Sequence, residues 1–244
     1  MVLKPPLFLY KTVSKHMKQT FLLFCCFLIV IGCGDQKNNK EINEFKNALG
    51  TGNVLELDNY ILAFENNFLK GKYPNAELQD AYRKITSESI ENLKQAFNQY
   101  FDEQNRKRFL DSQLWNEIYA PADSVWIEDD EFVIQFVYKS ADGVNPVSMT
   151  GERLPKPKDR DSLKVELLKW VDFNKDGKYL NALIKVKNHN KFLKDYVKTK
   201  STFGVITPGA FQYLIDINKP DLNDYLNRRI IAIELSEVLH NFRE

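Results

Sequence analysis

Residues 125–138 have the sequence VWIEDDEFVIQFVY, and they decide the fold because the spacing of apolar residues changes there. Two runs rich in β-branched and aromatic residues, 125–127 and 132–138, flank four acidic residues. Runs of this composition on either side of a short polar turn predict an antiparallel β-hairpin. We therefore expect a hairpin that turns at residues 128–131.

Helical spacing precedes the hairpin. Apolar side chains recur at steps of three and four residues, which predicts four amphipathic helices before Pro121. Their apolar stripes are Leu57, Tyr60, Ile61, Phe64 and Phe68; Leu78, Ala81, Tyr82 and Ile85; Ile90, Leu93, Phe97, Tyr100 and Phe101; and Leu114, Trp115 and Ile118. Aromatic stripes could line a ligand groove, but helices that pack on one another show the same pattern. We expect these stripes to form a core.

A second hairpin is predicted after the first. Residues 140–162 contain glycines, prolines and charges, and we expect them to form a long irregular connection. Leu163, Val165 and Leu167 then alternate with polar residues, and a later run from Leu180 to Val186 alternates in the same way. The Asp176-Gly177 step between the two runs predicts a tight turn with a positive φ angle.

The C-terminal part is predicted to be helical. Thr207-Pro208 is suited to capping a helix and filling its first turn. The run from Ile231 to Leu235 fits a strand or a helix, and the lack of a turn residue favours a helix. The fold class is therefore α+β: a helical N-terminal half packed with an antiparallel sheet of at least four strands and C-terminal helices. We expect one domain over residues 43–244, with a possible subdivision near residue 121.

The N-terminus has the features expected of an export signal. An 11-residue run without charges, from Phe21 to Ile31, follows Lys18 and precedes Gly32-Cys33 and a polar stretch. A membrane-spanning helix needs about 20 apolar residues, whereas a signal peptide needs about 7–15. A spanning helix and a signal peptide that is cleaved elsewhere remain alternatives. We expect residues 1–32 to be a signal peptide, starting at Met1 or at Met17, and residues 33–42 to be a tether.

This segment resembles the signal and lipobox of bacterial lipoproteins, over about residues 17–35 only. The resemblance implies that Cys33 is acylated, becomes the mature N-terminus and anchors the chain in a lipid bilayer. It places the protein in the bacterial cell envelope. Gly34 follows the cysteine where the family's inner-membrane retention signal has aspartate, which favours the outer membrane.

Charge and cysteine content limit the function further. The predicted signal holds four of the 34 basic residues and none of the 33 acidic ones, so the mature chain has a net charge of −3. A slightly acidic chain lacks the basic footprint that nucleic-acid binding needs. Cys25 and Cys26 lie in the predicted signal, so only Cys33, which the resemblance implies is acylated, would remain in the mature chain. We therefore expect neither disulfides nor zinc–thiolate sites.

Residues 172–177 form the motif DFNKDG, which is similar to the opening of an EF-hand calcium loop. Asp172, Asn174 and Asp176 would supply oxygen ligands. The twelfth position of the motif is Leu183 in place of the usual glutamate, and the following residues alternate like a strand. We expect a plain turn and no cofactor, with weak calcium binding as the alternative.

Other candidates have simple structural explanations. The lysines at positions 185, 187, 191, 194, 198 and 200 could meet anionic headgroups or a polyanion, but lysines also protect a solvated strand edge from aggregation. Neither His189 nor His240 has a two-histidine metal spacing. No catalytic motif stands out. The sequence predicts a non-catalytic module that binds an envelope protein or supports an envelope assembly. A module that binds a sugar, peptide or lipid, and an envelope hydrolase, are the alternatives.

Overall fold

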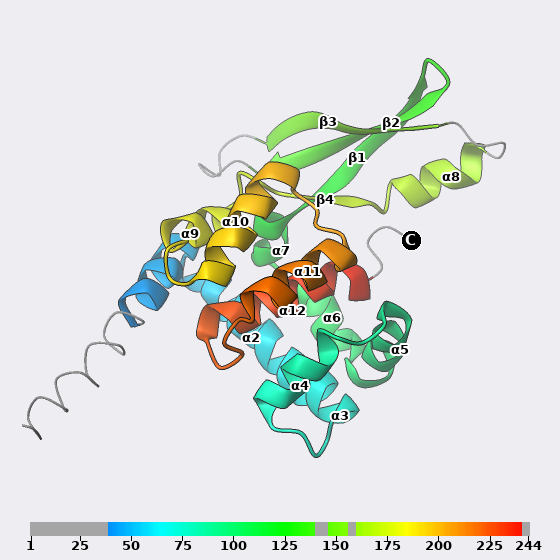
Figure 1. Ribbon diagram of the computed structural model, residues 1–244. Coiled ribbons are helices and arrows are strands. Elements are labelled where there is room, and N and C mark those ends of the chain that lie inside the picture. Colours follow the sequence, from blue (N-terminus) through cyan, green and yellow to red (C-terminus); the bar gives the residue numbers. More distant parts are fainter. Residues whose placement is uncertain (1–38, 140–145, 156–159, 241–244) are drawn as a thin grey trace, which may run out of the picture. The chain divides into compact units, whose positions relative to one another are not determined.

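The computed structural model describes residues 39–139, 146–155 and 160–240 (Figure 1). Residues 44–244 form one compact unit. A helix covers residues 39–49, so the last part of the stretch expected to be a tether is helical. Cys33 lies outside the described residues.

The fold is α+β, because helices precede and follow the strands of an antiparallel sheet. In chain order they are α2 (Thr51–Ala63), the π-helical segment η1 (Phe64–Leu69), α3 (Lys70–Lys72), α4 (Leu78–Ile85), α5 (Ile90–Tyr100), α6 (Glu103–Leu110), α7 (Gln113–Ile118), β1 (Tyr119–Glu128), β2 (Glu131–Lys139), β3 (Pro146–Pro155), α8 (Arg160–Leu167), β4 (Val171–Phe173), α9 (Lys178–Lys185), α10 (Lys191–Phe203), α11 (Pro208–Asn218) and α12 (Tyr225–Leu239).

The predicted N-terminal helices are confirmed. Most of the stripe residues are buried in the main core, among them Leu57, Phe64, Phe68 and Phe97, which are fully enclosed. Helix α6, which the sequence analysis did not identify, begins after Asp102, whose side chain accepts a hydrogen bond from the amide of Asn105. The N-terminal half therefore contains helices that the apolar pattern does not indicate, namely α6 and the helix over residues 39–49.

The first hairpin is also confirmed. Strands β1 and β2 pair antiparallel, and Val125 lies opposite Ile134. Asp129 and Asp130 form the two-residue turn with φ angles of 49° and 65°, the left-handed conformation that twisted hairpins require. The antiparallel sheet has the strand order β3-β2-β1-β4.

The prediction of a second hairpin is wrong. The run that contains Leu163 and Leu167 is part of α8, and the run from Leu180 to Val186 lies in and just after α9. Gly177 precedes α9 with a φ of −68°, so it does not adopt the expected positive angle. The segment forms strand β4, a short loop and a helix.

The prediction that residues 140–162 form an irregular connection is wrong in part. Residues 146–155 form β3, which pairs along β2 as the edge of the sheet. Proline stands at both ends of β3, a position that an edge strand tolerates because a ladder hydrogen bond is not required there. The sheet therefore has its four strands, although one lies where a loop was expected.

The C-terminal helices complete the fold. Thr207 caps α11 through the amide of Ala210, and Pro208 occupies its first turn, as predicted. The ambiguous run from Ile231 to Leu235 is helical and buried within α12. The α12 helix packs in the main core with the N-terminal helices, while the sheet and α8 share a smaller core around Phe132, Phe136 and Leu167.

Candidate functional site

A groove lies between the α4–α5 segment and the C-terminal helices α11 and α12. Its inner part has a volume of about 260 Å³ and its outer part about 520 Å³. Both parts are lined by Thr86, Ser87 and Gln212, so they meet at these residues. We call this feature the α5–α11 groove.

The inner part of the groove is mostly apolar. Its walls include Ile85, Ile90, Leu93, Ile206, Phe211 and Leu235. These side chains come from three distant segments of the chain, and each segment also contributes to the main core. The groove is therefore an opening in the packing between layers, and it suits an apolar group.

One buried acid borders the inner part. Glu234 on α12 lines the groove, and its Oε1 accepts a hydrogen bond of 2.7 Å from the Tyr196 hydroxyl. The same oxygen lies 2.6 Å from Nζ of Lys200. Burial and the charge of Glu234 raise the pKa of Tyr196 well above its usual value, so Tyr196 stays a donor. The inner part thus has mostly apolar walls and is bordered by a buried acid, one of whose oxygens is held by Tyr196 and Lys200.

Lys200 is the centre of this buried ionic cluster. Its side chain is fully buried on α10, and Nζ also lies 3.6 Å from Oε2 of Glu237. The ammonium stands 4.2 Å from the ring centre of Phe173, within cation–π range. Glu234 and Glu237 lie within the apolar run of α12, and acids in such a run need a buried partner. This pattern is the sequence signal by which the cluster could have been found.

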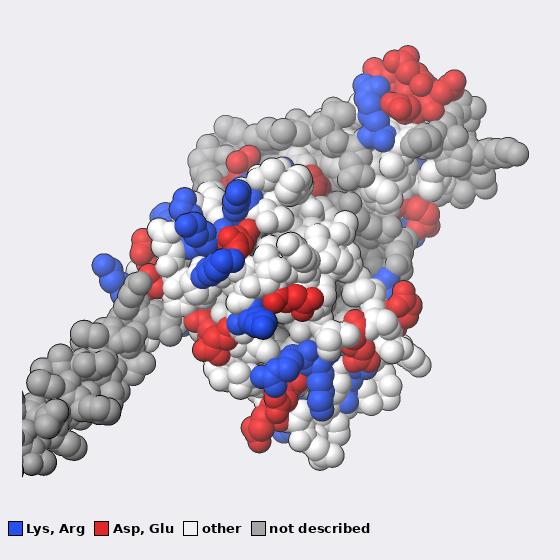
Figure 2. All heavy atoms as spheres, viewed as in Figure 1, with Lys and Arg blue, Asp and Glu red and all other residues white. Residues whose placement is uncertain are grey.

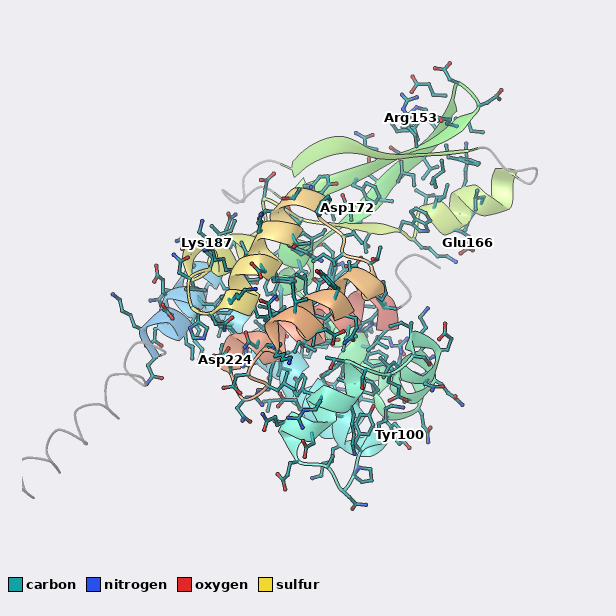
Figure 3. All side chains as sticks on the ribbon, in the orientation of Figure 1. Tyr100, Arg153, Glu166, Asp172, Lys187 and Asp224 are labelled. Atoms are coloured by element: carbon teal, nitrogen blue, oxygen red, sulfur yellow. The ribbon has the colours of Figure 1, made fainter. Side chains whose placement is uncertain are left out.

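The calcium candidates do not form an open ligand set. Asp172 accepts a hydrogen bond of 2.5 Å from Tyr138 and one from the amide of Phe173 (Figure 3). Asn174 is fully buried, donates to the carbonyl of Asn116 and accepts from the amide of Asp176. The expected strand after the motif is wrong, since helix α9 follows it. Leu183, at the glutamate position, is buried in the core.

Within the described ranges, no group of three or more His, Cys, Asp or Glu side chains is placed to hold a metal ion. Among the described helices, none has both the length and the apolar character needed to cross a bilayer.

His189 pairs with a carboxylate, and neither residue of the pair lines the groove. Its Nε2 lies 2.6 Å from Oδ2 of Asp224, whose Oδ1 accepts from the amides of Leu226 and Asn227 at the start of α12 (Figure 3). Burial raises the pKa of Asp224, but the bonds from His189 and the helix amides outweigh it and leave the pKa below its usual value. The pair ties the loop after α9 to α12.

His240 lies in an aromatic environment. Its ring packs against Phe97, Phe101 and Phe109, and burial, with the charge of Arg106, lowers its pKa to about 3. The imidazole is therefore neutral at physiological pH.

The lysine segment is not the strand edge that the sequence analysis offered as its structural explanation. Lys185 ends α9, the lysines at positions 191, 194 and 198 lie on α10, and Lys200 is buried.

In comparisons with known proteins, no family model, curated protein or solved structure matches this chain.

Proposed function

We propose that this chain is a lipid-anchored protein of the bacterial cell envelope that binds a partner protein without catalysing a reaction. The α5–α11 groove is the observation that carries the binding role. Cys33 and the apolar run before it support the anchor, and Gly34 favours the outer membrane as its location. The bilayer, through acylated Cys33, and one envelope protein are the partners.

The occupant of the groove that fits best is an apolar segment of the partner. The inner part offers mostly apolar walls, which suit apolar side chains of such a segment. Arg83, Asp216, Lys219 and Asp221 surround the outer part, so charges of both signs are available at its rim. An apolar centre with a polar rim is typical of protein interfaces.

A small-molecule module is the second candidate. The outer part alone, at about 520 Å³, is within the size range of ligand pockets, about 300–1,000 Å³. A sugar, a short peptide or a lipid would then take the place of the partner segment. The experiment below separates the two functions by the mass of the bound species.

Site-specific photo-cross-linking in intact cells tests the proposal. A photoreactive residue replaces Gln212, where the two parts of the groove meet, or Gln104, an exposed glutamine of α6 that serves as the matched control. We expect one discrete cross-linked protein from position 212 and none from position 104. Ser87 is exposed and lies where the two parts of the groove meet, so a tryptophan there should block the groove. Adding Ser87→Trp should therefore abolish the cross-linked product.

Two results would count against protein binding. Equal cross-linking from positions 212 and 104 would show general surface contact, and a product that survives Ser87→Trp would place the contact outside the groove. A mass increase of only a few hundred daltons at position 212 would support the small-molecule module instead.

A further inference from the structure

Helices α9 and α10 present a set of surface lysines that the groove does not explain. Lys191, Lys194 and Lys198 are exposed and spaced by three and four residues, which places them on one face of α10. Lys178 and Lys185 are seven residues apart on α9, and Lys187 follows it. We call these six residues the lysine face; Figure 2 shows Lys and Arg side chains over this region, and Figure 3 labels Lys187.

The segment that carries the lysine face contains few acidic residues. Between residues 175 and 204 the acidic residues are Asp176 and Asp195. Asp195 pairs with Lys191 at 2.8 Å, and the other five lysines make no ion pair within the described part of the chain. Because the segment is helical, protection of a strand edge does not account for these lysines. Their positive charge is available to a partner.

The compact unit begins beside helix α9, which carries part of the lysine face. Phe45, near the start of the compact unit, packs edge-on against Tyr179 of α9, with ring centres 6.5 Å apart. Cys33 precedes Glu44 by eleven residues, which span no more than about 40 Å even when fully extended. An anchor at Cys33 would therefore hold α9 close to the bilayer that contains it.

We propose that the lysine face docks the domain on the anionic phospholipid headgroups of the membrane to which Cys33 tethers it. This step rests on the proposed lipid anchor. Basic residues at an anionic surface each strengthen binding about fivefold, and the attraction acts over about 8–10 Å in salt. The tether supplies proximity, while the lysine face selects which side of the domain turns to the membrane.

Vesicle co-sedimentation tests the lysine face without the anchor. The unlipidated chain 33–244 retains the whole compact unit, and its cysteine is blocked. It is mixed with vesicles of phosphatidylcholine alone or with phosphatidylglycerol added, at low and high salt. We expect binding to the anionic vesicles only, and loss of that binding at high salt.

Two triple variants with equal charge change identify the surface. Lys191→Gln, Lys194→Gln and Lys198→Gln together should weaken binding to anionic vesicles about a hundredfold, from three steps of about fivefold each. The control changes Lys70, Lys84 and Lys107 to glutamine; these lysines are exposed on α3, α4 and α6, and binding should stay within about twofold. Circular dichroism confirms that both variants fold.

The outcomes separate this proposal from the others. Equal weakening by both variants would show that only net charge matters and would overturn the lysine face. Failure of the wild-type chain to bind anionic vesicles, together with binding to a soluble polyanion, would assign the face to a polyanionic partner. Because the assay uses neither acylation nor the groove, its failure leaves the cross-linking result and the acylation of Cys33 to be judged separately.

Discussion

At the scale of single residues, we expect the buried Lys200 to contribute to the stability of the fold. Its charge is compensated by Glu234 and Glu237. Removing one partner of a buried ionic cluster leaves the remaining charges without compensation, at a cost of about 3–5 kcal/mol. We expect Lys200→Met to lower the free energy of unfolding by that amount, measured by urea denaturation.

The control for Lys200 lies on the same helix. Lys198→Met removes an exposed lysine, and surface changes usually stay within about 0.5 kcal/mol. Adding Glu234→Gln to Lys200→Met should recover part of the loss, because one uncompensated carboxylate is then removed. Equal stabilities of Lys200→Met and Lys198→Met would contradict the ionic role.

His240 makes the fold sensitive to acid. Its pKa of about 3 in the folded chain lies far below the value of 6.5 for a solvated histidine. Between these pH values the unfolded chain binds a proton that the folded chain does not, so stability falls as the pH falls from 6.5 toward 3. At about 1.4 kcal/mol for each pKa unit, the loss amounts to several kcal/mol.

His240→Phe should remove this pH dependence. Phenylalanine suits the aromatic surroundings and does not titrate, so the variant should lose less stability than the wild type between pH 6.5 and 4. Urea unfolding at several pH values measures the slope. The region from pH 7 to 8, where His240 is neutral in both states, serves as the internal reference. Parallel curves for the two proteins over the acid range would contradict the assignment.

At the scale of elements, the junction of β4 with α9 depends on Gly177. A Cβ atom there would fall well inside contact distance of the carbonyl oxygen of Glu117. Overpacking of this kind typically costs about 1–3 kcal/mol. We expect Gly177→Ala to lower the melting temperature clearly, whereas Gly209→Ala, in the first turn of α11 with open space around its Cβ, should leave it unchanged or raise it slightly. A Gly177→Ala variant as stable as wild type would show that the backbones do not approach so closely.

The same junction explains why part of the fold was predictable and part was not. The run from Leu180 to Val186 alternates, but Tyr179, Leu180, Leu183 and Val186 also recur at helical steps, and burial selects the helical set. A run this short fits both the two-residue repeat of a strand and the three- to four-residue repeat of a helix, so only tertiary contacts decide between the two structures. The first hairpin was predictable because the short acidic turn and the apolar runs on either side of it both indicate a hairpin. Strand β3 was not predictable, because the prolines at its ends are more typical of a loop.

At the scale of the whole molecule, the groove was beyond the reach of the sequence. The lining of its inner part comes from residues 85–93, 206–212 and 234–238, which only the tertiary structure brings together. Ile90 and Leu93 were correctly expected to be apolar packing residues, but a helical stripe does not reveal where packing is incomplete. The predicted anchor is different, because the apolar run and Cys33, from which it is predicted, are adjacent in the chain.

The anchor can be tested by comparing the three cysteines of the full chain. If Cys33 is the acylated residue, cells given a clickable fatty acid should label the wild-type protein, and Cys33→Ala should abolish the label. Cys25→Ala and Cys26→Ala change the same residue type within the apolar run and should leave the label intact. Mass spectrometry of the N-terminal peptide should find the lipid on Cys33. Label that persists in Cys33→Ala would exclude this anchor, and with it the membrane tether on which the orientation of the lysine face depends.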